Sequence, residues 1–123
     1  MLVKDIYYLA GLFEGEGCFS IQKQGKSKYP LVQCVMTDPE PLARAARLLY
    51  GKVLGPYQPK QNKDYRPYYR LQFTGPKAIG VMLTLFSLLS PRRKEAIKKA
   101  LKASTLKYKT NQAKQVYCDY TIN

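Results

Sequence analysis

Turn-forming residues and helix caps divide this chain into one helix followed by two strands, and that order then repeats. The first helix is predicted over residues 5–14, because apolar side chains recur there at helical spacing and Asp5 is a suitable N-cap. Gly15 and Gly17 are predicted to end this helix. The order of elements limits the possible folds more strongly than any single residue does.

Two strands and a second helix follow. The strands are predicted over 19–28 and 31–37, where apolar and polar residues alternate, with a turn within 25–29. The second helix is predicted over 38–50, with Asp38 as its N-cap and a proline in its first turn. Its predicted inner face consists of Leu42, Ala45, Ala46 and Leu49.

The second pair of strands is predicted over 51–60 and 65–74, joined by a polar turn over 61–64. An apolar helix over 77–89 and a basic helix over 92–103 complete the predicted elements. This order predicts an α+β fold with an αββαββα core, in which helices cover one face of a four-stranded antiparallel sheet, and an extra C-terminal helix follows. The length suits one domain, so residues 1–123 are predicted to form a single domain.

The charge of the chain predicts a polyanionic partner. Lys and Arg number 21 against 8 Asp and Glu, which gives a formal net charge of +13, and double-stranded DNA or another nucleic acid is the first candidate. No membrane partner is expected. The longest apolar run, 78–89, is too short to span a bilayer, and the apolar side of the basic segment 92–101 is mostly Ala.

One face of the predicted sheet carries the strongest binding signal. In the strand over 65–74, Tyr69, Leu71 and Phe73 are predicted to point toward the core, and their neighbours point away. The outward set is rich in Arg, Lys and Gln, which match guanine and adenine edges and phosphates, although a solvated surface is the alternative interpretation. The predicted DNA contacts are Gln22, Gln24, Lys26, Lys28, Gln33, Gln58, Lys60, Arg66, Tyr68, Arg70 and Gln72.

The chain contains no His, which excludes His-based catalytic triads and His-ligated metals. Any metal must bind to oxygen ligands, and this favours Mg²⁺ over zinc. Cys18, Cys34 and Cys118 have no metal-binding spacing, so they are predicted to be reduced thiols in an intracellular, reducing compartment. No small-molecule cofactor is expected.

Residues 9–17 have the sequence LAGLFEGEG. This segment resembles the signature of the LAGLIDADG homing endonucleases: its first four residues match, Glu14 and Glu16 stand at the two Asp positions, and Gly17 matches the last glycine. The predicted αββαββα order is also that family's core order, so the resemblance extends over residues 5–103.

The resemblance implies a homodimer, because the chain carries one copy of the signature and the family's site is built from two. Gly11 and Gly15 are four residues apart, so they share one helix face and allow a second helix to approach closely across a two-fold axis. The implied dimer interface comprises Leu9, Gly11, Leu12, Glu14 and Gly15, with a mainly structural role for Glu14.

The implied activity is that of a site-specific homing endonuclease, which makes double-strand breaks in a long, near-palindromic DNA site during intron homing. Glu16 and the backbone carbonyl of Gly15 would bind Mg²⁺ or another divalent cation such as Mn²⁺ or Ca²⁺. Two carboxylates at two helix C-termini would repel each other without such a cation.

Further catalytic positions are carried over from the same resemblance. A basic residue lies in the family where the third helix gives way to the next, which makes Arg92 the first choice and Lys94 the second. Family members often carry a Gln at the end of the second strand. No Gln stands there in this chain, and Thr37 or Asp38 is expected to take its place.

The alternative is a protein on the same fold that binds nucleic acid without cleaving it, either an RNA maturase or a transcription regulator. The retained acid at Glu16 favours the endonuclease, because a regulator that has lost cleavage does not need that acid.

Overall fold

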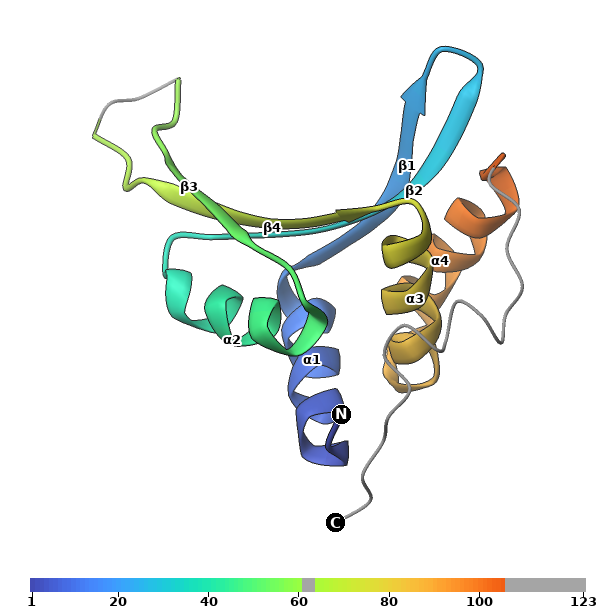
Figure 1. The fold of residues 1–123 in the computed structure, drawn as a ribbon, viewed down its shortest axis with the longest axis horizontal. Coiled ribbons are helices and arrows are strands. Elements are labelled where there is room, and N and C mark those ends of the chain that lie inside the picture. The colour runs from blue at the N-terminus through green and yellow to red at the C-terminus, as the bar shows by residue number, and fades with distance from the viewer. Residues whose placement is uncertain (61–63, 106–123) are drawn as a thin grey trace.

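A four-stranded antiparallel sheet, in the order β1-β2-β4-β3, carries the helices of the described residues on one face (Figure 1). The computed structural model describes residues 1–60 and 64–105. The predicted α+β fold class is therefore confirmed. The elements are α1 (Val3–Glu16), β1 (Gly17–Gln24), β2 (Ser27–Met36), α2 (Pro39–Leu49), β3 (Val53–Tyr57), β4 (Tyr68–Thr74), α3 (Pro76–Leu85), the 3-10 turn η1 (Phe86–Leu88) and α4 (Pro91–Ala103).

Both ends of α1 differ from the prediction. The helix begins at Val3 behind Leu2, so Asp5 is not its N-cap; Asp5 lies in the first turn and forms an ion pair with Arg44 at 3.6 Å. The helix also continues through Gly15 to Glu16. It ends at Gly17, where a Cβ atom would lie 2.6 Å from the carbonyl oxygen of Phe13. Only a glycine therefore allows the chain to turn so tightly from helix into strand.

The hairpin of β1 and β2 turns at Gly25 and Lys26, within the predicted turn 25–29, and Gly25 has a φ of +61°. The second strand therefore starts at Ser27, and the predicted boundaries at 28 and 31 were wrong. β2 pairs with β1 along one edge and with β4 along the other, which makes it a central strand. Residues 61–63 of the predicted polar turn lie outside the described residues.

The helix α2 confirms its predicted cap and inner face. The Asp38 side chain accepts a hydrogen bond from the backbone N–H of Glu40 at 3.0 Å, and Pro39 begins the helix. Its four predicted inward residues are buried. The predicted apolar helix 77–89 is shorter in the structure, because α3 ends at Leu85 and continues as η1.

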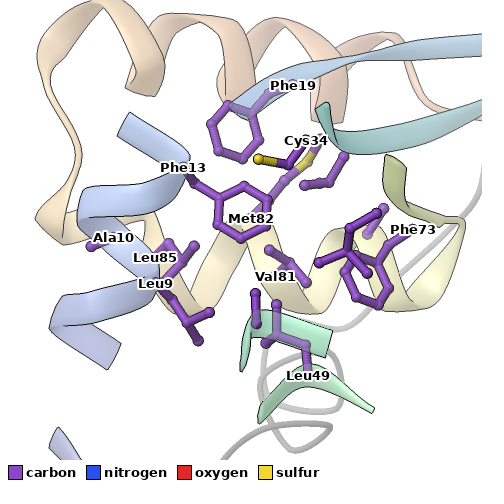
Figure 2. Packing of buried hydrophobic residues seen from close by; sticks show 14 of the residues in the cluster. Leu9, Ala10, Phe13, Phe19, Cys34, Leu49, Phe73, Val81, Met82 and Leu85 are labelled. Atoms are coloured by element: carbon purple, nitrogen blue, oxygen red, sulfur yellow. The ribbon is translucent and has the colours of Figure 1, made fainter. Parts of the chain in front are cut away.

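The core lies between the helices and the covered face of the sheet (Figure 2). Leu9 and Phe13 of α1 are completely buried there, as is Leu71 of β4. Phe13 also lies beside Phe19 of β1, with ring centroids 6.2 Å apart. This packing fixes the C-terminal end of α1 beneath the first strand of the sheet.

Candidate functional site

The outward side of α1 carries a line of exposed residues, two of them glycines. Tyr7, Gly11 and Gly15 follow one another at four-residue spacing, and all three are exposed. A Cβ atom built on Gly11 or on Gly15 would meet no atom within 4 Å. The folding of this chain therefore does not require a glycine at either position.

Glu16 closes this outward side at the last residue of α1, and it is exposed. Among the described residues its carboxylate forms no hydrogen bond or ion pair. Residues 1–60 and 64–105 contain no group of three or more His, Cys, Asp or Glu side chains that could hold a metal ion. One chain thus presents a single uncompensated carboxylate at a helix C-terminus.

Glu14, two residues earlier, belongs to a different arrangement. Its carboxylate accepts hydrogen bonds from the backbone N–H of Ser90 at 2.6 Å and from the Ser90 hydroxyl at 2.8 Å. The Arg93 guanidinium donates to the backbone carbonyls of Glu14, at 3.0 and 3.1 Å, and of Gly17. We call Glu14, Ser90 and Arg93 the α1–α4 clamp, because they join the end of one helix to the start of the other.

Hydrogen bonding keeps Glu14 ionised in the clamp. The Ser90 N–H and then the Ser90 hydroxyl lower the pKa of Glu14 below its usual 4.5, partial burial opposes them, and the charges of Arg93 and Arg92 add to the lowering. The ionised carboxylate also lies at the N-terminus of α4, where the helix dipole favours negative charge. Within the described chain the Glu14 carboxylate thus binds Ser90 and Arg93, two residues that the sequence did not point to, and its predicted place at a dimer interface stays a prediction.

The three basic residues at the start of α4, Arg92, Arg93 and Lys94, have different environments. The sequence pointed to Arg92 and Lys94, yet Arg92 is exposed, and the Lys94 ammonium lies 5.7 Å from the centroid of the Phe86 ring. Arg93, which was not singled out, is the residue that reaches the end of α1. A signal for it was present: Arg93 stands at helical spacing ahead of Ile97 and Ala100, which are buried on the inner face of α4.

Thr37 and Asp38 lie where β2 gives way to α2. Both are exposed, and Asp38 is engaged as the cap of α2. The strand register pairs Gly17, the residue after Glu16, with Cys34 rather than with the end of β2. The predicted pair is therefore displaced along β2 from the residue that faces the end of α1.

The open face of the sheet, which is the face away from the helices, gathers part of the predicted DNA-binding set. Gln33 of β2 lies directly opposite Gln72 of β4, and their neighbours in each strand point into the core. Alternation along β1 and β4 places Gln22, Gln24, Tyr68 and Arg70 on the same face. Leu71 and Phe73 are buried on the other face, as predicted.

Five members of the predicted set lie elsewhere. Lys26 is in the hairpin turn, Gln58 and Lys60 follow the end of β3, and Arg66 precedes β4. Lys28 pairs with Lys23 and lies on the helix side of the sheet. Those two residues line a hollow of about 360 Å³ between the hairpin and α4, together with Lys99 and the apolar side chains of Phe19, Ile21, Ala96 and Ala100.

The described thiols differ in their surroundings. Cys18 is exposed on the open face, and Cys34 is buried on the covered face; both are free. Burial, with a smaller contribution from Glu16, raises the pKa of Cys34 to about 11, and Arg93 partly opposes this. Cys118 lies outside the described residues. No helix in residues 1–60 or 64–105 has the length and apolar character to cross a membrane.

No protein-family model and no curated protein sequence matches the chain. Solved structures do. The intron-encoded homing endonuclease I-CeuI, complexed with DNA, superimposes with a TM-score of 0.58 at 14% identity over 81% of this chain. The LAGLIDADG meganuclease I-AabMI, bound to uncleaved DNA, gives 0.55 at 15% identity over 96%. The chain has the LAGLIDADG homing endonuclease fold.

The share of each neighbour that is matched differs greatly. The chain spans 53% of the I-CeuI chain and 45% of the I-AabMI chain. By contrast, it spans 92% of the chain of the homing endonuclease I-CvuI, with a TM-score of 0.56 at 12% identity. I-CvuI was crystallised on DNA targets with Ca²⁺ and, with the DNA not cleaved, with Mg²⁺. The LAGLIDADG fold unit therefore fills some chains and only about half of others.

Proposed function

We propose that this chain is a homing endonuclease that works as a homodimer and cuts both strands of a long, near-palindromic DNA site. The observation that carries the proposal is the outward side of α1, where two exposed glycines without a packing role lead to an uncompensated Glu16. A second copy packed on these glycines across a two-fold axis would bring the two Glu16 carboxylates together. The LAGLIDADG meganuclease I-AabMI, of whose chain this one spans 45%, has room for a second unit of this size, and this supports the need for a second copy.

The donor set at the end of α1 fits a divalent cation. Glu16 and the Gly15 carbonyl of each copy offer oxygen ligands, which Mg²⁺, Mn²⁺ and Ca²⁺ prefer. When bound, Mg²⁺ would stabilise charge on the scissile phosphate and lower the pKa of the attacking water. Glu16 would hold the cation, and the exposed Arg92 is the basic residue available for a phosphate.

The open face of the sheet would bind the duplex. Gln33, Gln72 and Arg70 offer the donors and acceptors that base edges in the major groove require. Lysines beyond the strands, such as Lys26 and Lys60, would contact phosphates, which gives affinity without sequence preference. The net charge of +13 supports this partner.

A second candidate is a binder that does not cleave, such as an RNA maturase or a transcription regulator. It is favoured by the end of β2, where Asp38 is engaged in capping α2 and the exposed Thr37 is displaced along the strand from the end of α1. The two candidate functions share the fold and the binding face. They differ in whether Glu16 binds a catalytic cation.

Cleavage of a randomised duplex library with Mg²⁺ separates the two. The wild type should release cut sites, and Glu16→Gln should lose cleavage while it keeps binding. Glu95→Gln is the matched control, because Glu95 is an exposed residue of α4 paired only with Lys98 at 3.5 Å among the described residues. If the wild type binds tightly and cuts nothing, the protein is a binder that does not cleave. If Glu16→Gln cuts as well as the wild type, Glu16 is not a catalytic residue.

A further inference from the structure

Arg70 occupies a distinctive place on the open face of the sheet. It lies in the middle of β4, directly between Val35 of β2 and Leu54 of β3. Both neighbours are apolar, and Leu54 is 40% exposed. Among the described residues no carboxylate forms an ion pair with Arg70. Its positive charge is therefore not neutralised by the part of the chain that the structure describes.

The Arg70 guanidinium is held by an aromatic pair. Its Cζ atom lies 5.5 Å from the centroid of the Tyr57 ring, within the range of a cation–π contact. The Tyr57 ring in turn lies 5.5 Å from the ring of Tyr68, its partner across the strands. The Nε atom of Arg70 is buried and has no hydrogen-bond partner among the described residues. Among the described residues, the cation–π contact with Tyr57 is thus the interaction that orients the side chain.

An arginine oriented in this way suits one particular base. Its parallel N–H groups match O6 and N7 of guanine in the major groove, and a side chain already held in position loses less conformational entropy on binding. The apolar side chains of Val35 and Leu54 suit the C5 methyl group of thymine.

We infer that Arg70, oriented by Tyr57, specifies a guanine at one position of each half of the DNA site. This inference rests on the proposed function, because it assumes that the open face of the sheet lies in the major groove.

The test is selection of bound duplexes from a randomised pool, without divalent cation, so that only binding is measured. The wild-type pool should carry a conserved guanine at one position of each half-site. Arg70→Lys keeps the charge, yet it should reduce the preference for that guanine by about 5-fold to 150-fold and leave the other positions unchanged. Arg47→Lys, an exposed residue of α2, is the matched control and should reproduce the wild-type site.

Two further measurements separate a direct contact from a change in folding. A 7-deazaguanine at the conserved position lacks N7, so it should weaken binding of the wild type more than binding of Arg70→Lys, because a lysine cannot form the parallel pair of hydrogen bonds. Tyr57→Phe keeps the ring and should keep the preference, whereas Tyr57→Ala should weaken it.

The outcomes distinguish this inference from the proposed function. If the wild type selects a defined site and Arg70→Lys or 7-deazaguanine changes nothing, Arg70 is not the reader and the endonuclease proposal stands. If the wild type selects no sequence at all, both proposals are overturned.

Discussion

The two sides of the last turns of α1 are built in opposite ways. On the inward side, Glu14 and Gly17 are held by Ser90 and Arg93 through hydrogen bonds to the carboxylate and to two backbone carbonyls. On the outward side, Gly11, Gly15 and Glu16 contact little or nothing in the described chain. A helix end that is fixed on one side and vacant on the other is suited to presenting a group to something outside the chain.

The glycines make the same contrast. Gly17 is required by the chain itself, because a Cβ atom there would overlap the backbone of α1, whereas Gly11 and Gly15 are surrounded by open space. An inward glycine therefore reports on folding. An outward glycine is not needed for folding and leaves space for a partner. This difference can be tested at each position separately.

The largest expected effect is on the outward side. Gly11→Leu should leave the chain folded but raise the dissociation constant of the proposed dimer by about 100-fold, because a bulky side chain would keep the two copies of α1 apart. Analytical ultracentrifugation measures this constant directly. An unchanged dissociation constant would show that α1 does not form the dimer interface.

On the inward side, Gly17→Ala should lower the free energy of unfolding by about 2.5 kcal/mol, because the new methyl group overlaps the Phe13 carbonyl. Urea denaturation, at a protein concentration low enough to dissociate the proposed dimer, measures it. Gly11→Ala is the control: it should be neutral or stabilise the helix by up to about 1 kcal/mol. Equal effects at the two positions would contradict the distinction between the two sides.

The clamp itself is tested by Arg93→Met, which keeps much of the side-chain length and removes the donors. The free energy of unfolding should fall by about 2 kcal/mol, because two carbonyls lose a charged hydrogen-bond partner. Arg92→Met, at the exposed neighbouring position, should change it by less than about 0.5 kcal/mol. If the two variants are equally stable, the clamp does not hold the helices together.

The smallest expected effect is the pH dependence of the clamp. Because the folded state lowers the pKa of Glu14, its contribution to stability is complete above the usual value of 4.5 and is lost as the pH falls through the lower folded value. The stability difference between wild type and Glu14→Gln should therefore shrink on acidification. Denaturation curves from pH 7 to pH 3 check this, and parallel curves would show that the Glu14 charge is not involved.

Local patterns were sufficient for some elements and insufficient for others. The cap and inner face of α2 were predicted correctly, because capping and helical periodicity depend on residues close in sequence. The start of β2 was misplaced, because Ser27 to Tyr29 join the strand through pairing with β1. Lys28 was predicted to point outward because the first strand was extended to residue 28. In the structure Lys28 belongs to β2, where it pairs with Lys23 and points to the helix side.

Candidate site residues followed the same division. Glu16 was recognised from a signature within nine residues. Arg93 was not, because its role depends on two helix ends, separated by 76 residues or more, meeting in the fold. Leu9, predicted at the interface, lies in the chain's own core with none of its surface exposed, and Leu12 is half-buried.

The sequence by itself determined the order of the elements, and its charge and signature predicted a polyanionic partner and different roles for Glu14 and Glu16. Only the tertiary structure decided which glycine is required by folding, which arginine holds α1 and which arginine rests on an aromatic pair. The reason is physical: periodicity, caps and net charge are properties of neighbouring residues, whereas close approach, hydrogen-bond geometry and burial exist only after distant segments have packed together.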